Sequence, residues 1–553
     1  MAEKKNLAMP TQEEEFVAKA YELFEEFNTA YESEWTRLNT NEKLYLGKHW
    51  EDMGSDDDIQ PMTPVIQSTC ENIKSDLMDN YPEAIIQPES SLDREIAEVV
   101  NALVKQNHDA MGYMKEYRNV AHDLVVGGYC VQEVGYDPKA NRGIGGAFIR
   151  YVNNHNILFD PQVTDVQDGR AVFKIAPRTI NWLEQRYPDK QGKFQQDEYK
   201  LEEDTQLKYD KTKSVLQIEY WWREYSETEE RWLVHMALLA GRQLLEDSRI
   251  EKPEGYFSVG EYPFVVTPFI RRKNSVLGYG IPDSFGAQQK YSDKLDQIAL
   301  KNAAMSSHNK LLNTEASGFD SDDLRDWSKD VHTGANLNGV TWFPTPPLPA
   351  YIVQMPGVMR QVIKEESGAN DFSRGNTASG VTAASAIAAL QEMSSKRSRM
   401  IAQQLHEAFK QAVRYEIEFE REFNVLPREV LLTVDGQQKT ATFESAMMTR
   451  HTQNGNDVPI EFFISIKVQR ENRWYVTAHN ELILQMVQMG VVQPAQAAEL
   501  MIFEGKEELL NKSRQQQMVP DPAMEQAAME QAVLDEEMAQ LPQPELMNNQ
   551  LAE

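Results

Sequence analysis

The feature that most limits the fold of this chain is its longest helical pattern, which runs from Val381 to Phe423 without an internal glycine or proline. It begins with an alanine-rich turn, and alanine is the strongest helix former. At 1.5 Å per residue such a helix would extend about 60 Å. Because a compact domain needs less, we expect this helix to link or span separate units. Its apolar face is formed by Ile387, Leu390, Ile401, Leu405, Ala408, Ala412, Tyr415 and Phe419.

The N-terminal region is also predicted to be helical. Apolar residues recur every three or four positions between Glu13 and Leu46, and Gly47 ends the pattern. Pro64 and Asp93 open a second and a third helical pattern.

Six short segments that follow have the composition of strands. They are rich in β-branched and aromatic residues and are separated by glycine, proline, asparagine or aspartate. No crossover helix is expected between them, which favours an antiparallel or mixed sheet in an α+β unit. The segments are Tyr129–Tyr136, Phe148–Val152, Ala171–Ile175, Ser214–Trp222, Trp232–Leu239 and Phe264–Ile270.

Residues 281–308 form a further helical pattern, in which Pro282 is acceptable because it lies in the first turn. Apolar residues and one asparagine step alternately by four and three positions, which makes one seam of about two heptads. The seam comprises Tyr291, Leu295, Ile298, Asn302 and Met305.

The flanks of this seam carry opposite charges. On a helical wheel Lys290, Lys294 and Lys301 lie on one flank, and Asp293 and Asp296 lie on the far side. A helix of this kind can pair with a copy of itself related by rotation, as a head-to-tail ring requires. The alternative is a solvated helix in a monomer.

The next stretch is expected to be a small polar module between two helices. Residues 309–349 contain one expected strand, Val340–Phe343, and a run of prolines. Helical spacing resumes at Gly357–Lys364, and residues 367–380 form a loop rich in glycine, asparagine and serine.

The C-terminal part is expected to return to a sheet and then to helices. Strands are predicted at Val430–Val434 and Glu461–Gln469, and helices at Thr477–Met489 and Gln493–Asn511. From Gln515 the chain is acidic and rich in glutamine.

Length and charge narrow the classes of protein further. A chain of 553 residues predicts roughly three or more packed units. Acidic residues outnumber basic ones 86 to 56, which gives a net charge of −30. Binding to phosphates requires lysine and arginine, so a protein that coats nucleic acid is disfavoured.

The sequence offers no sign of an oxidising compartment or of a membrane. Cys70 and Cys130 are too few for a disulfide framework and lack the spacing of a zinc site. No stretch approaches the roughly 18 apolar residues of a membrane span, and the first residues lack the apolar segment of a signal peptide. We therefore expect synthesis in a cytoplasm and no membrane partner.

A search for catalytic motifs finds none. The Gly-Lys pairs lack the remaining residues of a phosphate-binding loop, and Gly278 and Gly280 lack the third glycine of a dinucleotide fingerprint. His406 has no second histidine four residues on, and no nucleophile elbow occurs. We expect no enzyme, no cofactor and no metal. Two basic clusters, residues 271–273 and 396–399, suit either structural ion pairs or nucleic-acid contact.

Several stretches, taken in order along nearly the whole chain, resemble the portal, or head-to-tail connector, proteins of tailed bacteriophages. Each is weak by itself, and their order carries the resemblance. They are Leu46-Gly47-Lys48-His49-Trp50, Asn156-Ile157-Leu158-Phe159-Asp160-Pro161, Glu219-Tyr220-Trp221-Trp222, Gly280-Ile281-Pro282-Asp283 leading into Gln288-Gln289, and Thr377-Ala378-Ser379-Gly380-Val381-Thr382-Ala383.

This resemblance implies an α+β, multidomain and helix-rich portal fold that assembles as a ring, typically a dodecamer, at one capsid vertex. It implies a wing, a stem, a clip and a crown. The implied ranges are wing 1–280 and 381–477, first stem helix 281–308, clip 309–349, second stem helix 350–366, tunnel loop 367–380, and crown with acidic tail 478–553.

The resemblance also implies partners and a place in the virion. The ring would pass double-stranded DNA during packaging and ejection, and would bind terminase, then head-to-tail adaptor or tail proteins. Major capsid protein and a scaffold are further partners, first in the host cytoplasm and then at the portal vertex. The clip docking candidates are Asp320, Asp322, Asp323 and Trp342.

A DNA channel must let DNA slide, and a basic wall would retain it because every neutralised phosphate releases counterions. A net charge of −30 per copy predicts an acidic or mixed wall. Two other classes stay open: a helical virion adaptor or scaffold without a channel, and a cytoplasmic nucleic-acid enzyme with unrecognised motifs. The channel candidates are Glu365, Glu366, Asn370, Asp371, Arg374 and Asn376.

Overall fold

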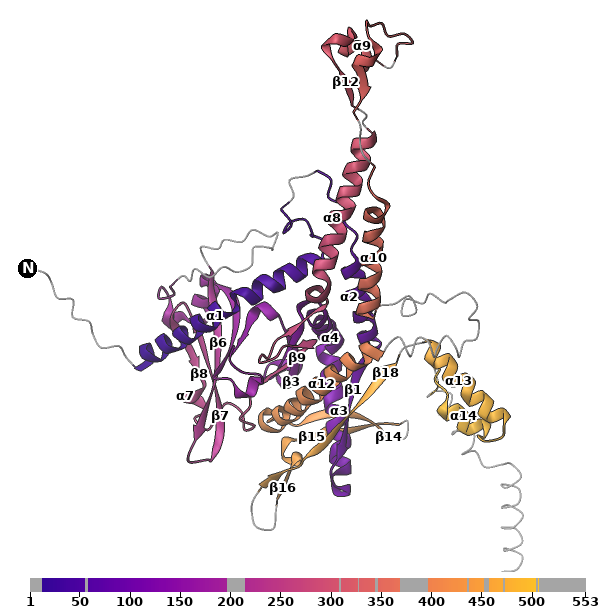
Figure 1. The fold of residues 1–553 in the computed structure, drawn as a ribbon. Coiled ribbons are helices and arrows are strands. Elements are labelled where there is room, and N and C mark those ends of the chain that lie inside the picture. Colours follow the sequence, from indigo (N-terminus) through magenta and orange to yellow (C-terminus); the bar gives the residue numbers. More distant parts are fainter. Residues whose placement is uncertain are drawn as a thin grey trace, which may run out of the picture. The chain divides into compact units, whose positions relative to one another are not determined.

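The structure is a computed structural model, whose ribbon Figure 1 shows, and its chain divides into two compact units. The first unit is Met1–Leu432 with Thr440–Arg470, and the second is Thr433–Lys439 with Glu471–Glu553. The residues that the structure describes are 12–54, 58–195, 214–307, 310–326, 328–343, 347–368, 396–434, 437–451, 457–470, 473–503 and 506.

The three expected N-terminal helices are present, and a fourth follows them. The first helix buries Phe24, Phe27, Tyr31 and Leu38, which recur at helical spacing on one face. The third helix ends where Gly112 takes a left-handed conformation, with φ at 66°. The helices are α1 (Gln12–Tyr45), α2 (Val65–Met78), α3 (Arg94–Met111) and α4 (Tyr113–His122).

All six expected strands are present, and every pairing among them is antiparallel. They belong to two sheets: one has the order β4-β5-β6-β7-β8 and the other the order β3-β2-β9. The two sheets also include β4 and β8, which were not expected. Their strands are β2 (Tyr129–Asp137), β3 (Gly146–Val152), β4 (Ile157–Phe159), β5 (Ala171–Thr179), β6 (Ser214–Ser226), β7 (Arg231–Ala240), β8 (Gln243–Asp247) and β9 (Phe264–Pro268).

Short elements connect these strands. They are α5 (Ala140–Gly143), α6 (Ile180–Arg186), α7 (Ser248–Glu251), β10 (Ile270–Arg271) and β11 (Gly278–Tyr279). Gly278 and Gly280 belong to this close-packed connection, and their backbones lie against that of residues 125–128.

Several described strands were not expected from the sequence, and the longest of them follows α2. Strand β1 (Asn80–Pro88) contains Pro82 and Pro88, residues that disfavour a central strand. Among the described residues it pairs only with β18 (Phe462–Arg470), almost 400 positions later, in a two-stranded antiparallel ribbon. A proline is tolerated there because its missing N–H can face away from the single partner.

The described part of the expected long helix is α12 (Lys396–Phe423), and residues 381–395 lie outside the described residues. Its apolar face packs into the main core: Phe419 stacks on Phe257, with 4.4 Å between ring centroids. The hairpin strands that follow are β14 (Arg428–Val434), β15 (Gln437–Phe443), β16 (Thr449–His451) and β17 (Asp457–Pro459).

Helices α8 (Ile281–Ser307) and α10 (Ala350–Ser367) pack against each other (Figure 1). The small module follows α8 and precedes α10 in the sequence. Helix α10 begins at Ala350 and not at Gly357, and it contains Pro356. The module holds the antiparallel pair β12 (Leu311–Asn313) and β13 (Val340–Trp342), with α9 (Ser321–Arg325) between them.

The second unit contains two described helices, α13 (Arg473–Gln488) and α14 (Pro494–Leu500). Asn480 of α13 connects this helix to the segment just after α14, because its side-chain amide donates a hydrogen bond to the carbonyl oxygen of Ile502 at 2.8 Å. The second helix is shorter than expected and ends at Leu500. Among the described residues, none of the helices has the length and apolar character to cross a membrane.

Candidate assembly site on the α8–α10 pair

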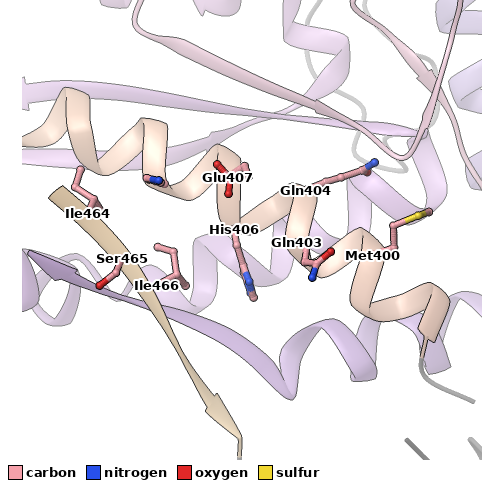
Figure 2. A pocket seen from close by; sticks show the side chains of 9 residues that line it. Met400, Gln403, Gln404, His406, Glu407, Ile464, Ser465 and Ile466 are labelled. Carbon is pink, nitrogen blue, oxygen red and sulfur yellow. The ribbon is translucent and has the colours of Figure 1, made fainter. Parts of the chain in front are cut away.

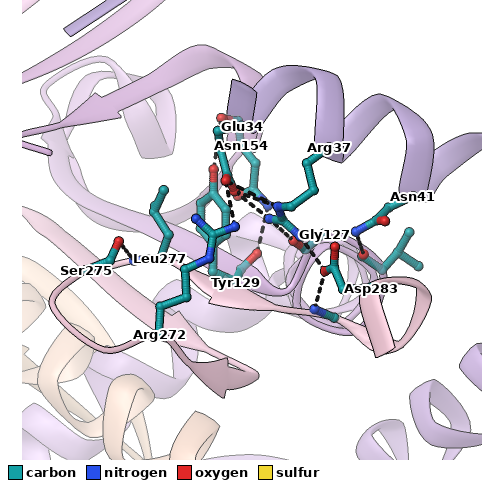
Figure 3. A network of polar contacts seen from close by, with 12 residues as sticks. Glu34, Arg37, Asn41, Gly127, Tyr129, Asn154, Arg272, Ser275, Leu277 and Asp283 are labelled. Carbon is teal, nitrogen blue, oxygen red and sulfur yellow. Dashed lines mark hydrogen bonds and ion pairs between the residues drawn. The ribbon is translucent and has the colours of Figure 1, made fainter. Parts of the chain in front are cut away.

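The first turn of α8 is anchored to α1 by a network of charges that Figure 3 shows. The Asp283 carboxylate accepts a hydrogen bond from the backbone N–H of Gly280 at 2.7 Å, which satisfies a donor at the start of the helix. The Arg37 guanidinium contacts both Asp283 and Glu34, and it donates to the carbonyl oxygen of Gly127 at 2.8 Å.

Glu34 is nearly buried and lies between two guanidiniums. Its second partner is Arg272, at 2.8 Å. A buried carboxylate needs such compensation, because desolvation penalises its charge. Arg272 belongs to the first basic cluster of the sequence, so this member of the cluster has a structural ion pair.

Deeper along α8 the face that points into the protein is polar. Gln289 and Gln297 each donate a side-chain hydrogen bond of 2.8 Å to a backbone carbonyl, of Thr63 and Ile59 respectively. The residues between α1 and α2 are therefore fastened along α8 by side-chain amides. This inverts the usual rule that a helix buries its apolar stripe.

His49 and Asp293 form a fully buried pair on this face. The Nδ1 atom of His49 lies 2.6 Å from the Asp293 carboxylate, and its Nε2 atom lies 3.0 Å from the Leu44 carbonyl oxygen. Both ring nitrogens thus lie within hydrogen-bonding distance of oxygen atoms. Asp293 also accepts from Gln289 at 3.0 Å.

Two carboxylates that were expected to face a neighbouring copy are used inside the chain instead. Asp293 is buried against His49, and so it is withdrawn from the candidates for contact between copies. Asp296 forms an ion pair with Arg360 of α10. The lysines of the other flank stay candidates for contact between copies. Lys290 and Lys294 have no ion-pair partner among the described residues.

The apolar seam of α8 is exposed in the single chain. The side chains of Tyr291, Ile298 and Met305 are 62%, 45% and 59% exposed. Helix α10 has a comparable seam, in which Tyr351 and Val358 are 64% and 55% exposed. Helix α8 therefore buries polar side chains, and both helices leave large apolar side chains in solvent. A second copy could cover such a surface.

The structure describes two of the six channel candidates. Glu365 and Glu366 are exposed in the last turn of α10, and Glu365 accepts a hydrogen bond from the Gln361 side chain at 2.8 Å. The other candidates, Asn370, Asp371, Arg374 and Asn376, lie outside the described residues.

The clip candidates lie in the module between α8 and α10. Asp320 caps α9 by accepting from the backbone N–H of Asp322 at 3.1 Å. Asp323 forms an ion pair with Lys329, and the hydrogen bond that the lysine donates lowers the pKa of Asp323. Asp322 and Trp342 are exposed. Docking at these residues stays a prediction.

A surface hollow of about 610 Å³ lies between α12 and β18, as Figure 2 shows. Its lining combines amide and apolar side chains with the charged Glu407 and Lys410. His406, which also lines it, is hydrogen-bonded to the carbonyl oxygen of Asn80 at 3.0 Å. Across the described residues there is no cluster of histidine, cysteine and carboxylate side chains that could hold a metal.

The anchoring residues were not singled out from the sequence. His49 belongs to the stretch Leu46–Trp50 that resembles portal proteins, but nothing in the sequence marked it as an anchoring residue. Arg37 and Gln297 belong to no recognisable motif. Apart from Glu34, which lies three residues before Arg37, their partners are backbone carbonyls or residues more than 200 positions away. A polar stripe at helical spacing, Gln289, Asp293 and Gln297, was the available signal.

Comparison with protein families agrees with this arrangement. The chain matches the family described as Phage P22-like portal protein over residues 22–553, which is nearly its whole length. No curated protein matches it. The paired helices with an inserted module and the extent of the match lead to one identification: the chain belongs to the P22-like family of tailed-phage portal proteins.

Proposed function

We propose that copies of this chain close into a ring at one capsid vertex and enclose a channel for double-stranded DNA. The observation that carries the proposal is the pair of exposed apolar seams on α8 and α10. Burying apolar surface contributes roughly 25 cal/mol per Å², so rows of large exposed side chains favour association. A ring formed by rotation covers both seams in every copy.

The proposed channel serves packaging and ejection of the genome. The net charge of −30 supports a wall that does not retain DNA, because few phosphates could be neutralised. The ring would dock terminase and later head-to-tail adaptor or tail proteins through residues 309–349, and it would contact the major capsid protein. In this proposal the wing, stem, clip and crown keep the ranges given above.

The seams can be tested by adding a charge where burial is proposed. Ile298→Lys should shift the protein from rings to single chains, because a lysine within an apolar contact is desolvated without a partner. Sedimentation velocity and negative-stain images measure the shift. Ile250→Lys is the matched control, because Ile250 is also exposed but belongs to α7.

If Ile298→Lys forms rings as readily as the unchanged chain, the seam does not carry assembly. If the unchanged chain itself remains single at high concentration, the proposed channel is wrong, and a non-channel adaptor becomes the better description.

A further inference from the structure

The faces of α8 follow from its internal contacts. Asp296 meets Arg360 and therefore points to α10, while Asp293 points into the protein. At about 100° per residue, Lys294 lies about 160° around the helix from Asp296. The side of α8 that faces away from α10 thus carries Lys294, with Ile298 and Met305 beside it.

The same reasoning applies to α10. Ile363 is fully buried, and Arg360 reaches α8, so these residues mark its inner side. Glu365 lies about 160° from Ile363 on the helical wheel. The outer side of α10 therefore carries Glu365, with the exposed Val358 and Tyr351 beside it.

The two outer faces also correspond in level along the helices. The chain reverses between α8 and α10, so residue numbers run in opposite directions from the Asp296–Arg360 contact. Counting from there places Ile298 level with Val358, and Met305 level with Tyr351, to within about one turn.

By the same count, the level of Glu365 along the helix pair lies between the levels of Lys290 and Lys294. All three are on α8 or α10, and both lysines lack a partner among the described residues of their own copy. Asp293 and Asp296 are already engaged, and Glu365 is an exposed carboxylate on the outer side of α10 at this level of the helix pair.

We propose that the outer face of α8 in one copy packs along the outer face of α10 in the next copy. Ile298 meets Val358 and Met305 meets Tyr351 across this interface, and Lys290 and Lys294 pair with Glu365. This inference rests on the proposed ring. Rotation about an axis along the helices keeps every residue at its level, so residues at equal levels meet.

The interface assigns Glu365 to a contact between copies and not to the channel wall. The two assignments differ in a measurable way for Glu365→Lys. A lysine at the channel wall would leave the ring intact and slow the passage of DNA. A lysine at the interface would face Lys294 and weaken the ring itself.

Charge reversal tests the pairing. Lys294→Glu and Glu365→Lys should each raise the concentration at half assembly by about fivefold at low salt, within the range for exposed ion pairs. The double variant should return to within about twofold of the unchanged chain, since the pair is restored in reverse. Lys19→Glu, an exposed position on α1, controls for the change in net charge.

Failure of the double variant to recover would overturn the pairing, as would single variants that assemble normally. Either result leaves rings of the unchanged chain in place, so it is distinct from failure of the proposed function. Circular dichroism shows whether each variant is folded.

Cysteine cross-linking gives an independent readout. Chains with Ile298→Cys are mixed with chains carrying Val358→Cys before assembly and are then oxidised. Covalent dimers should form with little background, because Cys70 and Cys130 are buried. In the control, Tyr351→Cys replaces Val358→Cys and lies about 10 Å further along α10, beyond the reach of a disulfide. Equal dimer yields from both mixtures would contradict the inferred register.

Discussion

Asp123 illustrates how a single side chain couples the stability of this protein to pH. It begins the π-helical segment η2 (Asp123–Gly127) and accepts a hydrogen bond from the Tyr151 hydroxyl at 2.7 Å. Burial raises its pKa to about 6. The native state therefore holds a proton between about pH 4 and pH 6 that the unfolded chain releases.

This shift predicts that the Asp123 contribution to stability is largest at low pH and is lost as the pH rises through 6. Over the whole shift the loss is on the order of 3 kcal/mol, since one pKa unit corresponds to about 1.4 kcal/mol. Asp123→Asn keeps a hydrogen-bond acceptor but cannot ionise, so its stability relative to the unchanged chain should increase from pH 4.5 to pH 7.5. Urea unfolding followed by tryptophan fluorescence measures this difference. A difference that stays constant over that range would contradict the assignment.

At the residue scale, the sequence predicted positions on a helix better than it predicted partners. The wheel correctly separated the lysines from Asp293 and Asp296. It could not show that the aspartate side faces the chain's own interior, because His49 and Arg360 are brought there only by tertiary folding. A buried polar stripe and an exposed apolar seam give the same periodicity.

At the scale of elements, the joint between η2 and α8 depends on close backbone approach. Gly128 has a φ of 92°, and a Cβ atom there would lie 2.5 Å from the backbone nitrogen of Gly280, just before α8. Gly112, between α3 and α4, also has a positive φ, at 66°, but a Cβ atom there would meet nothing within 4 Å.

This pair of glycines separates backbone strain from steric overlap. Gly112→Ala should lower the free energy of unfolding by only about 1–2 kcal/mol, the cost of a left-handed alanine. Gly128→Ala should cost clearly more, because the backbones of η2 and α8 must also move apart. Chemical denaturation with a far-ultraviolet signal compares the two. Equal losses would mean that the joint tolerates displacement.

The longer elements largely followed from local patterns, whereas most of the short strands were not predicted. Alternation and turn residues correctly located the six expected strands, and helical spacing located α1, α2, α3 and α8. Strand β1 was missed because its prolines argue against a strand and its partner is remote in sequence. Apolar spacing indicated α10 only from Gly357, whereas the resemblance implied a helix over residues 350–366; α10 begins at Ala350 and contains Pro356.

At the scale of the whole molecule, the order of elements identified the family before any contact was known, and the family match confirms that identification. The α+β fold class is also confirmed. The proposed contacts between copies could not be predicted in full, because they depend on which faces of α8 and α10 remain uncovered after the chain has folded.

Negative-stain or cryo-electron microscopy of the purified full chain tests the central claim most directly. The account predicts closed rings of identical copies around a central hole wide enough for a DNA duplex, about 20 Å or more, with the α8–α10 pairs packed side by side around it. Single chains at high concentration, or assemblies without such a hole, would contradict it.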